Sequence, residues 1–395
     1  MGRMRWPPRL VRTDVLGEVK DVSGRKTPRD IGRTVWLGGN TYYIFGDTFC
    51  FDDKGDFLGA RNNTIAYVPD PLNQPTASRY LESQPYVSSY VPHTESEEAY
   101  ENDPEHKKNN DRVTCWSFGG IIQDHPGSKH GWMFFDKMLT HGGTAGHHFG
   151  MGVCRVSVED GLHTKAERIM GDRMVFGEEE PRFGSISHLC DDDGWVYLLG
   201  GKEPNPPFDM RNLFARIRRD AVFTQRENYE FWVKDGEGGK WAKDYSDLDE
   251  LKSLGDFNVQ AQGAIIKCPE LAPEGKPYMW FGVNKFMASH LYVGCAPVVT
   301  GPWDVQDLGE IPKDPDWESG PRYALYPNPQ ASNMAVGEML CTWSDGGQMG
   351  GKVLAARFWF DAVGGPDLLQ SQEQSSQQRS GFKEGLKSKI EGLFK

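Results

Sequence analysis

The chain has 395 residues, of which 38% are hydrophobic and 12% aromatic, so it is long and apolar enough to bury a large core. Its 56 acidic and 44 basic residues give a net charge of −12, which argues against a nucleic-acid partner because phosphate binding rewards a basic surface. No run of about 18 apolar residues occurs, so we expect no membrane span.

The beginning of the chain and the cysteines bear on location. Residues 1–8 read MGRMRWPP, and no apolar stretch follows the basic residues, so the sequence predicts no secretory signal. The seven cysteines are scattered and form no CxxC pair, which is typical of reduced, buried thiols. We therefore expect a cytoplasmic monomer, with a secreted mature form as the alternative.

Strand-like segments repeat along the chain in one order: a strand, a tight turn, a strongly aromatic strand, a loop and a third strand. Their β-branched and aromatic residues, bounded by Gly, Pro, Asn or Asp, are typical of strands. Intervals of roughly 60 to 90 residues predict a β-propeller, and one or two β-sandwiches are the alternative. The five units cover residues 34–68, 119–156, 185–217, 263–294 and 331–358.

The repeat defines the expected domain organisation. We predict an all-β fold in which residues 25–365 form one five-bladed β-propeller and residues 1–24 form an N-terminal extension. The acidic, polar segment 93–111 is expected as a long loop inserted between the first two blades. Residues 366–395 are expected as a flexible tail ending in a short amphipathic helix, which docks on its own domain or weakly contacts a partner or a membrane surface. One further helix is predicted over residues 246–254.

Polar residues at the strand ends indicate where a site lies. In a propeller, the residues just before the first strand and just after the second strand of every blade converge at one mouth of the central channel. The predicted strand starts carry Arg29, Asp30, Trp116, Glu180, Arg182, Gln260, Tyr326 and Asn328. The second strands are followed by, or end in, Asp47, Asp136 and Asp345. Amides and charges bind hydroxyl groups and aromatic faces stack on sugar rings, so this mixture suits a polyhydroxylated ligand.

Two carboxyl groups across such a mouth can supply the acid and the base or nucleophile of glycoside hydrolysis. We expect Asp47 or Asp30 as base or nucleophile and Glu180 as acid. The expected substrate-binding residues are Arg29, Trp116, Asp136, Arg182, Gln260, Tyr326, Asn328 and Asp345. Structural roles are the alternatives, because Asp47 can cap a turn and Asp30 can pair with a neighbouring arginine.

Cofactor signals are weak. His141, His147 and His148 share a Gly-rich loop, but their spacing matches no strong metal motif, so we expect no metal there. A structural Ca²⁺ ion in the channel is the alternative to a cofactor-free protein. The sequence contains no phosphate-binding glycine motif and no GxSxG nucleophile elbow, which removes support for nucleotide binding and for an α/β-hydrolase.

The run Arg29-Asp30-Ile-Gly, followed by Tyr42-Tyr-Ile-Phe-Gly-Asp-Thr-Phe49, resembles the opening of a glycosidase-like family of five-bladed propellers. That family includes endo-D-arabinanases, and its wider relatives are arabinanases, levansucrases and invertases. Weaker similarities are Tyr229–Trp232 with Trp241, Val299–Trp303 and Cys341–Ser344, so that the resemblance spans about residues 25 to 362. The resemblance implies a funnel-shaped site with acidic catalytic residues. Of the acidic residues in this chain, only Asp30 and Asp47 lie in the matching motifs.

Three functions follow from these expectations. The first is a glycoside hydrolase-like enzyme acting on a furanosyl-containing or related glycan. The second is an intracellular propeller enzyme, an isomerase or cyclase, that shapes a small metabolite without hydrolysis. The third is a non-catalytic carbohydrate-binding or scaffold propeller.

Overall fold

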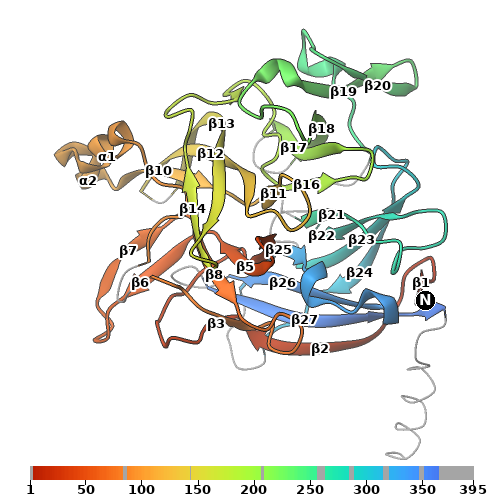
Figure 1. Ribbon diagram of the computed structural model, residues 1–395, viewed down its shortest axis with the longest axis horizontal. Helices are drawn as coiled ribbons and strands as arrows, with labels where there is room; N and C mark the ends of the chain where they lie inside the picture. The colour runs from red at the N-terminus through yellow and green to blue at the C-terminus, as the bar shows by residue number, and fades with distance from the viewer. Residues whose placement is uncertain are drawn as a thin grey trace, which may run out of the picture.

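Five antiparallel sheets are arranged around a central axis, and each sheet is one blade of a ring (Figure 1). The computed structural model describes residues 3–82, 87–142, 144–205, 209–255, 263–283, 289–314, 320–346 and 351–363. In the third and fourth blades each strand pairs with the next one in the sequence, whereas the first and second blades skip strands and the N-terminal segment supplies the outermost strand of the fifth. The five-bladed β-propeller predicted from the repeat is confirmed.

The strands fall into blades as follows. The first blade contains β4 (Arg33–Leu37), β5 (Asn40–Phe45) and β8 (Thr64–Val68). In the sequence, a separate hairpin of β6 (Thr48–Phe51) and β7 (Phe57–Arg61) comes between β5 and β8. The second contains β10 (Asp111–Trp116), β11 (Ile121–Gln123), β12 (His130–His141), β13 (Thr144–Glu159), β14 (His163–Glu167) and β15 (Phe176–Gly177). The third contains β16 (Ser187–Cys190), β17 (Trp195–Asn205), β18 (Asp209–Arg218), β19 (Tyr229–Asp235) and β20 (Gly238–Ala242). The fourth contains β21 (Gly263–Lys267), β22 (Tyr278–Gly282), β23 (His290–Ala296) and β24 (Asp304–Glu310). The fifth contains β25 (Arg322–Pro327), β26 (Glu338–Asp345), β27 (Lys352–Phe360) and β2 (Leu10–Glu18).

The N-terminal segment closes the ring. β2 pairs with β27 as the outermost strand of the fifth blade, and β3 (Lys20–Asp21) then pairs with β9 (Ala77–Ser78) beside the first blade. A further pair joins β1 (Arg3–Met4) to β28 (Ala362–Val363). Residues expected as an N-terminal extension therefore belong to the ring, because they supply hydrogen bonds that join its last blade to its first.

Two helices replace most of the expected acidic loop. α1 (Glu95–Asn102) begins with a capping box, in which Thr94 and Glu97 each bind the other's backbone N–H. Asp103 caps α2 (Pro104–Asn109), and both helices stand at the edge of the ring beside β10 (Figure 1). The helix predicted over residues 246–254 is reduced to a 3₁₀ helix at Leu248–Glu250, and the predicted tail helix lies outside the described residues. Other 3₁₀ helices cover Arg226–Asn228, Pro329–Ala331 and Met334–Val336.

Apolar side chains fill each interface between neighbouring blades. Between the fourth and fifth blades, for example, Phe281 packs with Trp343 and Phe358 in one cluster of buried residues. A smaller cluster of Ile31, Ala264, Ala324 and Tyr326 fills the centre of the ring. All seven cysteines are unpaired, and six of them are buried. No helix among the described residues is long and apolar enough to cross a membrane.

The channel has two distinct ends. The first strand of each blade runs from one end to the other, and a hairpin then returns the chain. Asp30 precedes β4 and Asp47 follows β5, so both lie at the end where first strands begin, called here the Asp30 mouth. The end where first strands finish is called the opposite mouth.

Candidate functional site

Asp30 and Asp47 come from the two strands of one hairpin, and the structure brings them together. The backbone N–H of Asp30 donates to the carbonyl of Asp47 at 3.1 Å, and that of Gly46 donates to the carbonyl of Asp30 at 3.0 Å. These bonds continue the antiparallel hydrogen bonding of β4 and β5 past the ends of the two strands. The two carboxyl groups are therefore neighbours at the Asp30 mouth.

The backbone beside Asp30 has an unusual conformation. Ile31 has a φ of 67°, a left-handed conformation that is strained for a β-branched residue. Its N–H donates to the hydroxyl of Ser344 in the fifth blade at 2.7 Å, which helps to hold this conformation. Gly46 leaves the room that Asp30 needs, because a Cβ atom at position 46 would lie 2.4 Å from Asp30 Oδ1. Local backbone and neighbouring blade together fix the direction of the Asp30 side chain.

Burial makes Asp30 a candidate proton donor. Desolvation and, to a smaller extent, the nearby charge of Asp47 raise the pKa of Asp30 to about 8. The hydroxyl of Tyr323 donates to Oδ2 at 2.8 Å and opposes this shift, while Oδ1 is buried without a hydrogen-bond partner. Asp30 is therefore protonated at neutral pH.

Asp47 accepts a hydrogen bond from another residue at the Asp30 mouth, Trp116. Burial raises the pKa of Asp47, but a hydrogen bond from Trp116 and the charge of Arg112 oppose that rise. The indole N–H of Trp116 donates to Asp47 Oδ1 at 3.2 Å, and its ring stacks on Phe118 with centroids 6.0 Å apart. Trp116 thus orients one carboxyl group and adds an aromatic surface on which a sugar ring can stack.

A second polar group joins the second and third blades. Asp136 is 5% exposed, and its two carboxylate oxygens lie 3.0 Å from His148 Nε2 and 3.5 Å from an Arg182 nitrogen. Asp136 lies directly opposite Trp116 in the register of β10 and β12, so both side chains project from the same face of the sheet. The expected residues Asp136 and Arg182 therefore contact one another beside the Trp116 wall.

Glu180, the expected acid, is held in a separate network. One of its carboxylate oxygens accepts hydrogen bonds from Arg226 at 2.8 Å and from Tyr245 at 3.3 Å. The other accepts from the backbone N–H of Gly177 at 2.9 Å. No contact among the described residues joins Glu180 to Asp30, because these partners belong to the outer part of the second and third blades.

Two expected ligand-binding residues have structural roles. Arg29 is 2% exposed and donates hydrogen bonds to Val19, Ser78 and Tyr80, beneath the first blade. Asn328 is fully buried, and it joins blades by accepting from the N–H of Thr34. Neither side chain is open to a ligand, since both are used in joining the first blade to its neighbours.

The remaining expected residues have three different outcomes. Tyr326 is fully buried in the central cluster, and the guanidinium of Arg33 lies 4.9 Å from its ring centre. Asp345 is also fully buried, and the N–H of Gly320 donates to it at 3.1 Å. Gln260 lies outside the described residues. The interior positions of Tyr326 and Asp345 suit support of the mouth better than contact with a ligand.

The loop histidines do not converge on a metal. His141 pairs with Asp111 at 2.7 Å, His147 with Glu178 at 3.0 Å, and His148 with Asp136. Each histidine therefore has its own carboxylate. His148 was missed as a site residue because the Gly-rich sequence around it indicated only a metal loop, whereas the bulged β12–β13 pairing turns it toward Asp136.

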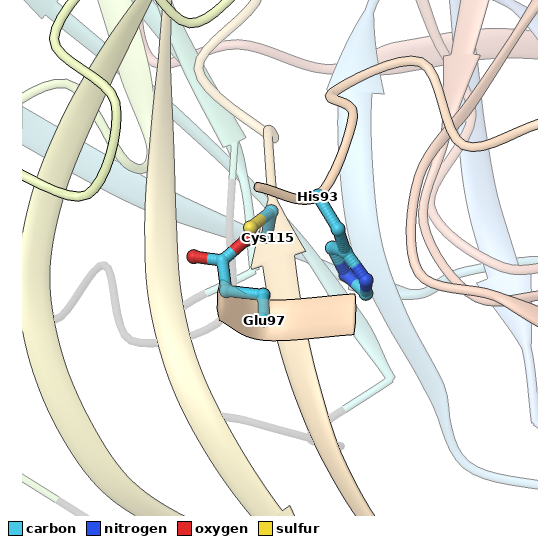
Figure 2. Close-up of side chains that lie close together, drawn as sticks. All are labelled: His93, Glu97 and Cys115. Carbon is cyan, nitrogen blue, oxygen red and sulfur yellow. The ribbon is translucent and has the colours of Figure 1, made fainter. Parts of the chain in front are cut away.

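One cluster within the described ranges combines metal-ligating side chains, and it lies beside α1 (Figure 2). It consists of His93, Glu97 and Cys115. Glu97 already forms ion pairs with Lys137 and Arg168, which compensate its charge. Burial raises the pKa of Cys115 to about 12, whereas a metal would need the thiolate. The donors at this place therefore do not fit a metal ion.

Comparisons with known proteins support the fold. No family model and no curated protein matches the sequence. A solved protein of Bacteroides ovatus, provisionally assigned as a hydrolase, is 15% identical, with 84% of this chain and 85% of that chain covered and a TM-score of 0.58. An N-acetylgalactosamine deacetylase from F. plautii is 11% identical, with 88% and 95% covered and a TM-score of 0.49.

A third solved structure is an exo-β-1,3-galactanase from Phanerochaete chrysosporium. It is 12% identical to this chain, with 89% of this chain and 64% of the galactanase covered and a TM-score of 0.46. Of these three, only the Bacteroides ovatus protein has a TM-score above 0.5, and at 15% identity its similarity supports the fold alone. The chain has the five-bladed propeller fold of the glycosidase-like proteins that its sequence resembles.

Proposed function

We propose that this protein is a glycoside hydrolase whose two catalytic carboxyl groups are Asp30 and Asp47. The observation that carries the proposal is the pairing of these two groups at one mouth, with burial raising the pKa of Asp30 to about 8. Glycoside hydrolysis needs one carboxyl group that is protonated at working pH and a second that acts as base or nucleophile. The provisional hydrolase assignment of the Bacteroides ovatus protein agrees by analogy of fold only.

The surroundings suit a division of roles. Asp30 donates a proton to the oxygen of the glycosidic bond that breaks, and Tyr323 positions its carboxyl group. Asp47, held by Trp116, acts as base on a water molecule or as nucleophile at the anomeric carbon. After the bond breaks, the proton of Asp30 is on the leaving sugar. If Asp47 is the base, it takes a proton from the attacking water, whose hydroxyl bonds to the anomeric carbon, and exchange with solvent returns both carboxyl groups to their starting states. If Asp47 is the nucleophile, water activated by Asp30 displaces it from the glycosyl ester, which frees Asp47 and returns the proton to Asp30.

The substrate class follows from the groups around the pair. The stacked rings of Trp116 and Phe118 offer an apolar face to a sugar ring, and Arg182 and His148 offer polar groups to its hydroxyls. A furanosyl-containing or related glycan fits this mixture.

The test is hydrolysis of a panel of arabinofuranosyl, galactosyl and xylosyl oligosaccharides, followed by reducing-end release. We expect Asp30→Asn and Asp47→Asn each to lower kcat at least about 100-fold, the usual size of a lost acid or base. Asp220→Asn is the matched control, because its side chain is 85% exposed on the third blade. Hydrolysis that survives in the Asp30→Asn, Asp47→Asn double variant would contradict the assignment of these two carboxyl groups. No hydrolysis of any oligosaccharide in the panel by the parent protein would instead favour conversion of a small metabolite without hydrolysis.

A further inference from the structure

A cavity lies at the opposite mouth, away from Asp30 and Asp47. Its volume is about 340 Å³, within the range of small-molecule sites. The first strands of all five blades reach it, and its polar lining includes Arg33, Gln123, His188, Arg219, Lys267 and Gln330. No acidic residue of the described chain lines this cavity. The cavity is therefore locally basic in a protein whose net charge is −12.

The uncompensated charge comes from two arginines. Lys267 is neutralised by Asp191 and Asp192, whose carboxylates lie 2.5 and 2.8 Å from its nitrogen. Burial and the charge of Arg33 lower the pKa of His188 to about 3, so this ring is neutral. Neither Arg33 nor Arg219 has a carboxylate within 4.0 Å among the described residues. Arg33 is buried and Arg219 is half-buried. Removing a guanidinium from water without a counter-charge is costly, so this arrangement is unusual.

Arg33 also lacks a full set of hydrogen-bond acceptors. It is 8% exposed, and its Nη1 donates to the carbonyls of Phe118 and Ile186 at 2.8 and 3.3 Å. Its Nε is buried without a partner, as is Nε of Arg219. Arg29 shows the contrast, because three acceptors inside the fold satisfy its guanidinium. The two cavity arginines thus retain both charge and hydrogen-bonding capacity for another group.

The glutamines of the cavity add donors rather than acceptors. The side-chain oxygen of Gln123 accepts from the N–H of Gly127 at 2.8 Å, and that of Gln330 accepts from Thr34 at 3.1 Å. Their NH₂ groups are the parts that remain for a ligand. Donors and positive charge without acidic side chains are the chemistry of an oxyanion site.

We propose that the opposite mouth binds a small molecule bearing an oxyanion, a phosphate, sulfate or carboxylate group, between Arg33 and Arg219. This site is separate from the proposed active site, because Arg33 and Tyr326 pack together in the channel between the two mouths. Phosphate, sulfate and acetate share the required chemistry and serve as probes.

The test is titration of the full chain with inorganic phosphate, sulfate or acetate at constant ionic strength, followed by calorimetry and thermal unfolding. We expect saturable binding of one anion per chain, with Tm rising as the site fills. Arg219→Gln should weaken binding at least tenfold. Arg218→Gln is the matched control, because Arg218 is the adjacent residue but does not line the cavity. Asp30→Asn should bind as the parent protein does.

Several results would overturn the proposal. They are the absence of saturable binding for all three probes, an equal effect of Arg218→Gln and Arg219→Gln, or the same saturable stabilisation by chloride alone. Arg33→Lys is a second variant, in which charge is kept but the forked geometry is lost. If it folds, we expect weaker binding, and if it does not fold, Arg219→Gln still decides the question.

Discussion

The hydroxyl of Tyr323 donates a hydrogen bond to Asp30 across the junction of the fifth and first blades, with 2.8 Å between Oη and Oδ2. The two residues are 293 positions apart, so only closure of the ring brings them together. This bond favours the ionised carboxylate, whereas burial and Asp47 favour the protonated acid. Burial prevails, and Asp30 thereby acquires a pKa near the pH at which enzymes commonly work.

Removing the charge of Asp30 should stabilise the fold at higher pH. The pKa of Asp30 is about 8 in the folded protein and about 3.9 in an unfolded chain. The folded state therefore binds more protons between these values, and its stability falls as pH rises through this range. We expect the Tm difference between Asp30→Asn and the parent to grow from pH 5 to pH 8 and then to level. A constant difference, like that expected for the exposed Asp220→Asn, would contradict the raised pKa.

Tyr323→Phe should move the pH profile of hydrolysis rather than abolish it. Loss of the hydrogen bond removes an interaction that lowers the pKa of Asp30, so this pKa rises further. If Asp30 is the acid, the alkaline limb of kcat shifts to higher pH, with a loss of about 3- to 10-fold at the optimum for lost positioning. Tyr278→Phe is the matched control, because that hydroxyl donates to Asp191 near the opposite mouth. An unmoved limb would argue against Asp30 as the acid.

Trp116→Phe separates two roles of the indole. Phenylalanine keeps an aromatic face but loses the N–H that donates to Asp47. Because that bond lowers the pKa of Asp47, we expect the acidic limb of the rate profile to move to higher pH. KM should change about threefold or less, since stacking is largely kept. A large rise in KM with an unchanged limb would show that Trp116 acts only through substrate contact.

Glu180→Gln tests which carboxyl group is the acid. Glu180 and its partner Arg226 are partly exposed, so breaking their ion pair should cost about 1 kcal/mol or less of stability. We expect kcat within about threefold of the parent, against a loss of at least about 100-fold for Asp30→Asn. A comparable loss in Glu180→Gln, measured with Tm unchanged, would transfer the role of acid to Glu180.

The sequence predicted the blades because their local chemistry repeats. It also predicted that Asp30 and Asp47 meet, since both flank one hairpin with a short turn. The partners of Glu180 could not be foreseen in this way. Arg226 and Tyr245 are 46 and 65 residues beyond it, and only the folding of the third blade onto the second brings them to its carboxylate.

In the acidic segment 93–111, by contrast, the sequence itself carried a signal for the structure that forms. Thr94 and Glu97 have the spacing of a capping box, which marks the beginning of a helix, but the surrounding negative charge suggested a solvated loop. In the structure Glu97 is 3% exposed and paired with Lys137 and Arg168. Contacts with the second blade therefore offset charge that would disfavour the isolated segment.

Arg29→Met distinguishes a structural arginine from a substrate-binding one. The change removes three hydrogen bonds and leaves the carbonyl of Val19 and the hydroxyls of Ser78 and Tyr80 with fewer partners in the interior. Stacking of the guanidinium on Phe45, at 3.7 Å, is lost as well. We expect a loss of about 3 kcal/mol in unfolding free energy, measured by urea denaturation, with KM unchanged in the folded fraction. A higher KM at unaltered stability would instead place Arg29 in contact with the substrate.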